Sequence, residues 1–179
     1  MNINLEQFKF TASYCRRLAE NMWGKGGTHA YRTNKRGFYY YSCSGHGGYV
    51  VPKESLSKRT LEILNRAGFT PEPIYLGVQH GSNSTQVLGI LWPNYQRLPS
   101  IRYYPHLGRF EWMEYEEVYT FEEDCNWAII EYLEGVNTEH TSKITDEVRL
   151  KTIERWSENV YREILRIQAI ESEPQLTIL

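Results

Sequence analysis

The residues that could perform chemistry lie mainly in one glycine-rich run, residues 37–52, which places His46 among three glycines. Tyrosine-rich and valine-rich stretches flank the glycines, and such stretches favour strands. Glycine allows the backbone conformations that a tight connection requires. The run therefore predicts a β-hairpin in which residues 38–42 pair with residues 48–51 and His46 lies in the connection.

A histidine at such a tip could act as general acid or base, because an imidazole titrates near neutral pH. Glu123 or Asp124, in an acidic run far along the chain, could orient the imidazole of His46 if the two segments meet. Cys43 or Ser44 could serve as nucleophile, although only one could face His46, since consecutive strand residues point to opposite faces. A metal ion held by the histidine and both carboxylates is a further alternative with a weaker spacing signal.

The same residues also have a purely structural interpretation. Thr120 and Glu123 have the spacing of a capping box, which predicts a helix that begins at Thr120. The acidic residues Glu122 to Asp124 would occupy its first turn, where the helix dipole stabilises each carboxylate by about 0.3–1 kcal/mol. No catalysis is then needed to explain them. We expect no cofactor and no metal, since the chain contains no Cys-x-x-Cys or His-x-x-x-His pair.

A second candidate site is an acidic and aromatic face between residues 110 and 127. Aromatic residues with a polar tip are enriched at binding hot spots, and the chain has 14 tyrosines and 5 tryptophans. Such a face suits a basic partner groove, because complementary potentials steer association. The alternative is a strand edge that its charges keep solvated. The residues expected to contact a partner are Glu111, Trp112, Glu114, Tyr115, Glu116 and Glu117.

The composition of the whole chain limits the classes of function. A chain of 179 residues predicts one domain, and a net charge of −2 argues against direct binding to nucleic acid. No stretch approaches the roughly 18–20 apolar residues of a membrane span, and residues 1–6 lack the pattern of a secretion signal. Three distant cysteines argue against a disulfide framework. We therefore expect the protein in the cytoplasm.

Hydrophobic periodicity predicts an α+β fold, an antiparallel sheet of hairpins packed by N-terminal, central and long C-terminal helices. The three parts of this single domain, residues 1–179, are an N-terminal helix over 4–23, an α+β core over 37–134 and a C-terminal helix over 146–169. Within the core we expect a helix between Pro52 and Gly68. We also expect strand pairs 74–79 with 86–92 and 101–104 with 110–119, and the helix from Thr120 to Gly135.

Three short blocks resemble a family of uncharacterised domains from phages, plasmids and other mobile elements. They are Trp23-Gly24, residues 41–48 and residues 119–128. The family pattern is an early Trp-Gly, a strand ending in Ser-x-x-His-Gly-Gly, and a later Tyr-x-Glu-Glu-Asp-x-x-Trp-Ala. Here one additional residue separates the tyrosine from the acidic triplet. The resemblance implies a mobile-element setting and no particular reaction.

These observations predict a phage or mobile-element accessory protein that binds a host protein in the host cytoplasm. Inhibition of a nucleic-acid-binding defence complex, such as a CRISPR effector, is its concrete form by analogy. The alternative is a small hydrolase or transferase that uses His46 with Glu123 or Asp124, and Cys43 as a candidate nucleophile. Neither a membrane partner nor direct nucleic-acid binding is expected.

Overall fold

A computed structural model of the chain describes residues 12–23, 29–80, 85–91 and 108–172. The helices and strands follow one another as α1 (Ala12–Trp23), β1 (His29–Tyr31), β2 (Tyr39–Ser42), β3 (Gly47–Pro52), the 3-10 helix η2 (Lys53–Ser55), α2 (Lys58–Arg66), β4 (Glu72–His80), β5 (Thr85–Leu91), β6 (Arg109–Glu122), α3 (Trp127–Glu134), α4 (Asp146–Trp156) and α5 (Glu158–Ser172). None of these helices is long and apolar enough to cross a membrane.

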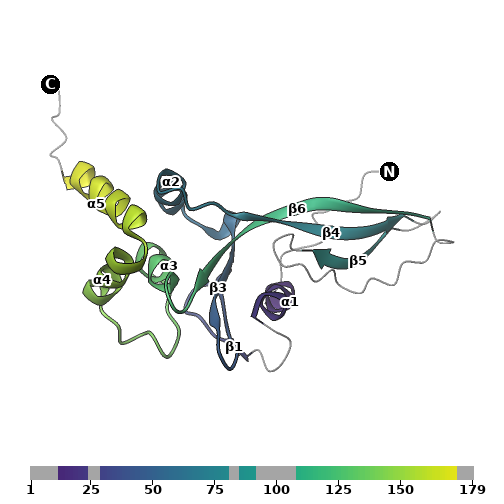
Figure 1. Cartoon of the computed structure of the whole chain (residues 1–179), viewed down its shortest axis with the longest axis horizontal. Helices are drawn as coiled ribbons and strands as arrows, with labels where there is room; N and C mark the ends of the chain where they lie inside the picture. Colours follow the sequence, from purple (N-terminus) through teal and green to yellow (C-terminus); the bar gives the residue numbers. More distant parts are fainter. Residues whose placement is uncertain (1–11, 24–28, 81–84, 92–107, 173–179) are drawn as a thin grey trace, which may run out of the picture.

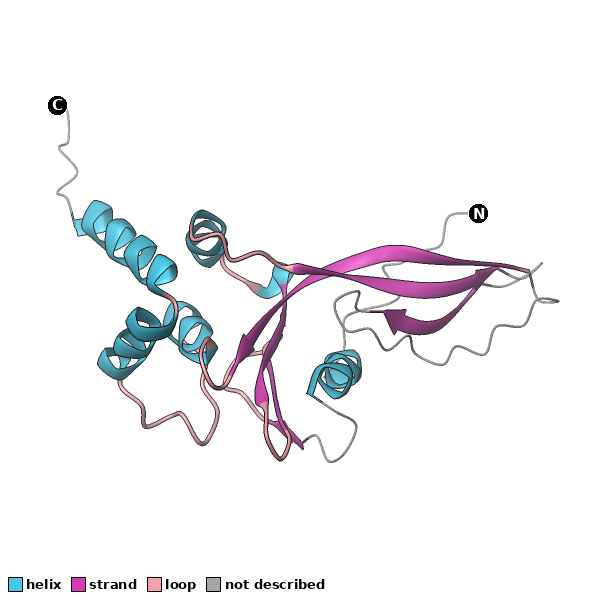
Figure 2. Cartoon of the chain, viewed as in Figure 1, coloured by secondary structure: helices cyan, strands magenta, loops and turns pink. Residues whose placement is uncertain are grey.

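The strands form one six-stranded sheet in the order β1-β2-β3-β6-β4-β5, and every pairing is antiparallel. β6, with 14 residues, pairs with β4 over residues 109–118 and with β3 over residues 118–122. The strand therefore joins two hairpins that do not pair with each other. Helices lie on both faces of this sheet (Figures 1 and 2), which confirms the predicted α+β fold.

Two hydrophobic cores cover opposite faces of the sheet, because successive residues of a strand point to opposite sides. Val118 of β6 belongs to a core that it shares with Cys15 and Leu18 of α1. Tyr119 and Phe121 belong to a second core, which includes buried residues of α2, α3, α4 and α5. In Figure 1, α1 accordingly lies apart from the other four helices.

Both predicted hairpins for which the structure describes the strands are confirmed. In the first, Tyr40 pairs with Tyr49 and Tyr41 pairs with Gly48, and His46 lies in the connection. In the second, β4 pairs with β5 over residues 75–80 and 85–91. The expected strand at 101–104 lies outside the described residues, as does the N-terminal part of the expected helix over 4–23.

The prediction of a helix that begins at Thr120 is wrong. β6 continues to Glu122, and α3 begins at Trp127 after a turn. Thr120 pairs with Val50 of β3, and both of its neighbours on β6 are aromatic residues buried in the larger core. Sheet pairing and aromatic burial thus outweigh a local pattern worth about 1 kcal/mol.

The predicted C-terminal helix is interrupted at Ser157, which separates α4 from α5. Ser157 has φ −147° and ψ 55°, outside the helical region, and its hydroxyl donates to Asn126 Oδ1 at 2.9 Å. The helix expected after Pro52 begins later than predicted. Pro52 ends β3, α2 starts at Lys58, and the predicted stop is confirmed at Gly68, which has φ +73°.

Candidate functional site

His46 is exposed at the hairpin tip, whose turn is closed by a hydrogen bond from the Cys43 amide to the His46 carbonyl at 2.7 Å. The backbone brings the acidic run beside this hairpin, since the Glu123 amide donates to the Gly47 carbonyl at 2.9 Å. Among the described residues, however, no hydrogen bond or ion pair joins the imidazole to Glu123 or Asp124. The tip and the acidic run are neighbours without forming the predicted acid–base contact.

Glu123 has a different partner. Its Oε2 accepts a hydrogen bond from the Tyr40 hydroxyl at 3.1 Å and lies over Gly47, where a Cβ atom would collide with it. Burial, followed by the neighbouring charge of Glu123, raises the pKa of Tyr40. The Tyr40 ring packs edge to face on Tyr49, with ring centroids 4.9 Å apart. Glu123 therefore stabilises the hairpin.

The nucleophile and metal alternatives find no geometric support in the described part of the chain. The Cys43 thiol donates to the Trp23 carbonyl at 3.4 Å, and no hydrogen bond joins this thiol to His46. Ser44 is exposed in the turn. No group of three histidine, cysteine, aspartate or glutamate side chains among the described residues could hold a metal ion.

The glycines of the hairpin allow close packing. Gly48 has φ +149°, and a Cβ atom there would lie 2.9 Å from Glu122 Cα and even closer to the Phe121 carbonyl. At Gly47 a Cβ would lie 2.9 Å from the Tyr41 carbonyl oxygen. These two glycines let β3 fit between β2 and β6, so the sheet accounts for them without a ligand.

Strand pairing distributes the predicted partner-binding residues over two faces of the sheet. Glu111 lies opposite Val78 and Glu116 lies opposite Ile74, on the face that packs against α1. Trp112 lies opposite Gly77 and Glu117 lies opposite Pro73, on the other face. The change of register between Ile74 and Tyr75 falls at Glu114 and Tyr115, whose side chains lie outside the described part.

The carboxylates of this predicted face also have local partners. Glu111 pairs with His80 at 2.9 Å and with Arg109 at 3.0 Å. Glu117 pairs with Lys53. Burial, followed by the charge of Glu54, raises the pKa of Glu116. The partners of Glu111 and Glu117 reduce the charge that these two carboxylates present to an incoming protein.

A groove that the sequence did not reveal lies toward the C-terminal end of β6, beyond the last residue of β6 that pairs with β4. It is a cavity of about 290 Å³, here called the β6 groove, lined by Met22, Gly68, Phe69, Thr70, Glu72, Val118, Thr120, Glu122 and Asn126. Pairing between β4 and β6 ends with Glu72 opposite Val118, whereas β6 continues to Glu122 with β3 as its paired strand. The groove follows this edge of β6, which pairs with no described strand beyond Val118.

Local chemistry explains why β4 leaves β6 at this point. Gly68, with its positive φ, and Phe69 donate their amides back to Asn65 and Leu64 and so close the end of α2. Pro71 disfavours the helical conformation at Thr70, so the chain changes there from α2 toward the extended conformation of β4. The chain therefore joins the sheet only at Glu72.

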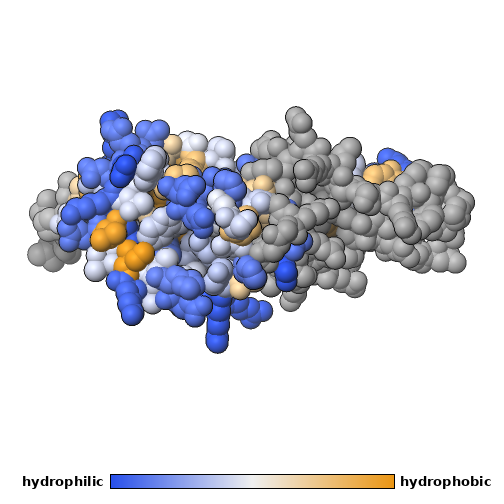
Figure 3. All heavy atoms as spheres, turned by 60° about the horizontal axis from the view of Figure 1, so that its bottom comes forward, coloured by the Kyte–Doolittle hydropathy of each residue, from blue (hydrophilic) through white to orange (hydrophobic). Residues whose placement is uncertain are grey.

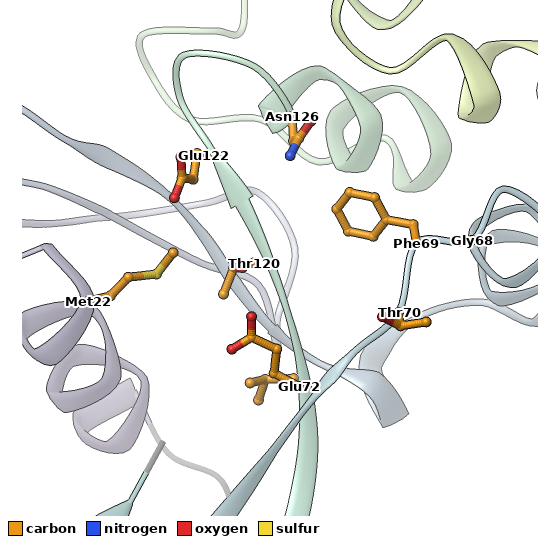
Figure 4. A pocket seen from close by; sticks show the side chains of 9 residues that line it. Met22, Gly68, Phe69, Thr70, Glu72, Thr120, Glu122 and Asn126 are labelled. Atoms are coloured by element: carbon orange, nitrogen blue, oxygen red, sulfur yellow. The ribbon is translucent and has the colours of Figure 1, made fainter. Parts of the chain in front are cut away.

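The side chains of the β6 groove divide into an acidic side and an aromatic side (Figure 4). Glu72 and Glu122 lie on either side of Thr120, with Met22 of α1 nearby. Phe69 approaches from the other side and stacks on Phe121, with ring centroids 5.4 Å apart. Neither ion pair nor hydrogen bond joins the Glu122 carboxylate to a cation among the described residues.

A second hollow of about 500 Å³ shares Gly68, Phe69 and Asn126 with the β6 groove and extends toward Trp156 and the start of α5. Trp156 is 53% exposed, and the Arg155 guanidinium lies 4.9 Å from its ring centroid. The shared residues place the two hollows next to each other.

Other exposed apolar side chains of α4 and α5 are scattered rather than gathered in a hollow. They include Val148, Leu165 and Ile170. The face in Figure 3 shows a small apolar patch at the helical end with hydrophilic atoms around it, and smaller apolar spots elsewhere. Isolated apolar residues of this kind are normal on a protein surface, so the β6 groove is the stronger candidate site.

The acidic run 122–124 was the available sequence signal for this groove, but the predicted helix at Thr120 concealed its place on a strand edge. A scan against protein-family models finds no match, and searches of curated proteins and of solved structures find none either.

Proposed function

We propose that this chain acts by binding a partner protein with a basic surface, and not by catalysis. The observation that carries this proposal is the β6 groove, which presents Glu122 and Glu72 beside Met22 and Phe69. Carboxylates near a hollow attract lysine or arginine side chains, while adjacent apolar groups supply contact area. The neighbouring hollow at Trp156 extends the surface with a residue type that is enriched at binding hot spots.

The class of partner that we propose is a host defence complex whose channel is basic because it binds nucleic acid. The resemblance of the three sequence blocks to mobile-element domains supports this class, and so does the acidic character of the groove. A protein that covers such a channel would act by occupying it, and it would need no catalytic residue of its own.

The proposal is tested by capture from host extract with the tagged wild-type chain and with Glu122→Lys. The matched control is Glu154→Lys, because Glu154 is exposed on α4 and has neither hydrogen bond nor ion pair among the described residues. We expect proteins captured by the wild type and by Glu154→Lys to be lost with Glu122→Lys, and capture to weaken as ionic strength rises. Equal capture by all three chains would contradict the groove as the binding surface.

A functional assay of host interference separates binding from catalysis. His46→Ala should retain at least half of wild-type interference, because the exposed imidazole has no partner in the acidic run. A general acid or base would instead lose about a hundredfold or more in rate. A folded but inactive His46→Ala variant beside a fully active Glu122→Lys variant would favour the enzymatic alternative.

A further inference from the structure

We propose that the open edge of β6 accepts an extended basic segment of the partner as an added strand. This inference rests on the proposed function and specifies how the β6 groove recognises its ligand. It concerns a short stretch of backbone, residues 119–122, in addition to the side chains that line the groove.

The register of β3 and β6 determines which backbone groups face the groove. The Glu123 amide donates to the Gly47 carbonyl, so these two residues form a hydrogen-bonded pair of the antiparallel ladder. Hydrogen-bonded and non-hydrogen-bonded pairs alternate in such a ladder. Phe121 and Tyr119 therefore bond to β3, whereas the amides and carbonyls of Thr120 and Glu122 point away from β3.

Within the described part of the chain, the backbone groups of β6 that point away from β3 have no strand partner beyond Val118. At Val118 they meet Glu72 of β4, but no backbone hydrogen bond joins Thr120 to residues 68–70 among those described. The Glu122 carbonyl accepts from the Asn126 amide at 2.9 Å and is already used. The Thr120 amide and carbonyl and the Glu122 amide remain directed into the groove, ready to pair with an extended chain.

The two sides of the β6 groove specify the side chains of the added strand. Alternate residues of a strand point to opposite faces. One set would meet Glu72, Glu122 and Met22, which favours lysine or arginine, and the other set would meet Phe69, which favours an apolar residue. Residues 119–122 span about 13 Å, so a segment of about four to six residues fills the edge. The expected ligand is an extended segment in which basic and apolar residues alternate.

The probe that tests this inference is the labelled hexapeptide Arg-Val-Arg-Val-Arg-Val, with binding measured by fluorescence anisotropy. Its comparison is Arg-Arg-Arg-Val-Val-Val, which has the same charge and composition. We expect the alternating peptide to bind wild-type protein at least tenfold more tightly. Equal affinities would overturn strand addition, because charge alone would then explain binding.

Methylated peptides test the backbone contact on wild-type protein, independently of any variant's folding. In the added strand, every second peptide amide would face β6. N-methylation of these amides removes the donor to the Thr120 carbonyl and should weaken binding at least fivefold. N-methylation of the other set should change the affinity less than twofold, because those amides face away from β6. Equal responses of the two sets would overturn the proposed pairing.

Protein variants separate this inference from the proposed function. Thr120→Pro removes the amide that faces the groove and leaves the β3 ladder bonded through Tyr119 and Phe121. It should bind the alternating peptide at least tenfold more weakly than Thr120→Ala, which lacks the hydroxyl and keeps the amide. If Glu122→Lys abolishes partner capture while Thr120→Pro and N-methylation have no effect, strand addition is overturned and the acidic groove remains the binding site. If none of these changes matters, both proposals fail.

Discussion

At the scale of single residues, the three glycines around His46 occupy different environments. Gly48 has a positive φ and touches the backbone of β6, whereas Gly45 has open space where a Cβ would lie. Gly48→Ala should therefore destabilise the fold by about 3 kcal/mol or more, since backbone atoms must move. Gly45→Ala is the matched control and should change stability by about 0.5 kcal/mol or less. Urea denaturation of both variants checks this prediction, and equal stabilities would contradict the packing assigned to Gly48.

Glu131 is a buried carboxylate whose hydrogen-bonding capacity is well used. It accepts from the Tyr49 hydroxyl and the Thr141 hydroxyl, each at 2.6 Å, and from Arg149 Nε at 3.0 Å. Burial, followed by the hydrogen bond to Glu131, raises the pKa of Tyr49. The side chain thereby ties β3 to α3, α4 and the loop that contains Thr141.

Glu131→Gln should reduce the free energy of unfolding by about 3 kcal/mol, because the buried Arg149 would keep only the exposed carboxylate of Asp146 as counter-charge. Glu154→Gln, on the exposed surface of α4, should change it by about 0.5 kcal/mol or less. Chemical denaturation monitored by tryptophan fluorescence measures both. A loss below about 1 kcal/mol for Glu131→Gln would show that the buried ion pair is dispensable.

At the scale of elements, the sequence predicts what local signals determine. The two hairpins are set by alternation and by turn residues, and they form as expected. The spacing of Thr120 and Glu123 is compatible with both a capped helix and a strand. Pairing with β3, which is distant in the sequence, determines that a strand forms. The break at Ser157 likewise depends on Asn126 from another element. The β6 groove was unpredictable for the same reason, since it exists where β4 stops along β6.

A comparison of hydroxyl deletions tests where helices begin. Ser57 is the N-cap of α2, and its hydroxyl accepts from the Thr60 amide at 3.2 Å. Ser57→Ala should therefore cost about 1 kcal/mol of stability. Thr120→Ala should cost about 0.5 kcal/mol or less, because Thr120 lies within β6 and caps no helix. Thermal unfolding measures the loss of stability in both variants. Equal losses would indicate that Thr120 caps a helix and would contradict its place in β6.

At the scale of the whole molecule, two carboxylates make opposite contributions to acid stability. Burial opposes ionisation of Glu134, but hydrogen bonds from Lys35, Thr60 and Ser57 outweigh it and lower the pKa below the ordinary 4.5. Its stabilising contribution is complete above pH 4.5 and is lost as the pH falls through the lower, folded-state pKa. For Glu116, burial and then Glu54 raise the pKa, so ionisation of Glu116 at neutral pH destabilises the fold.

The substitutions Glu134→Gln and Glu116→Gln should consequently shift the free energy of unfolding in opposite directions at pH 7. Glu134→Gln should lower the urea midpoint and flatten its fall below pH 4.5, whereas Glu116→Gln should raise the midpoint. Midpoints measured from pH 3 to pH 7 for wild type and both variants test this, with Glu154→Gln as surface control. Shifts of the same sign would show that these environments do not govern the acid response.

The position of β6 has a consequence for how the chain folds during synthesis. The hairpins β2–β3 and β4–β5 are local and can form as soon as their own residues are made, yet neither bonds to the other. The strand that joins them is the last of the six in the sequence. Translation must therefore pass Glu122 before the sheet closes, and until then the nascent chain carries two hairpins with an open edge that a chaperone or a second chain can reach.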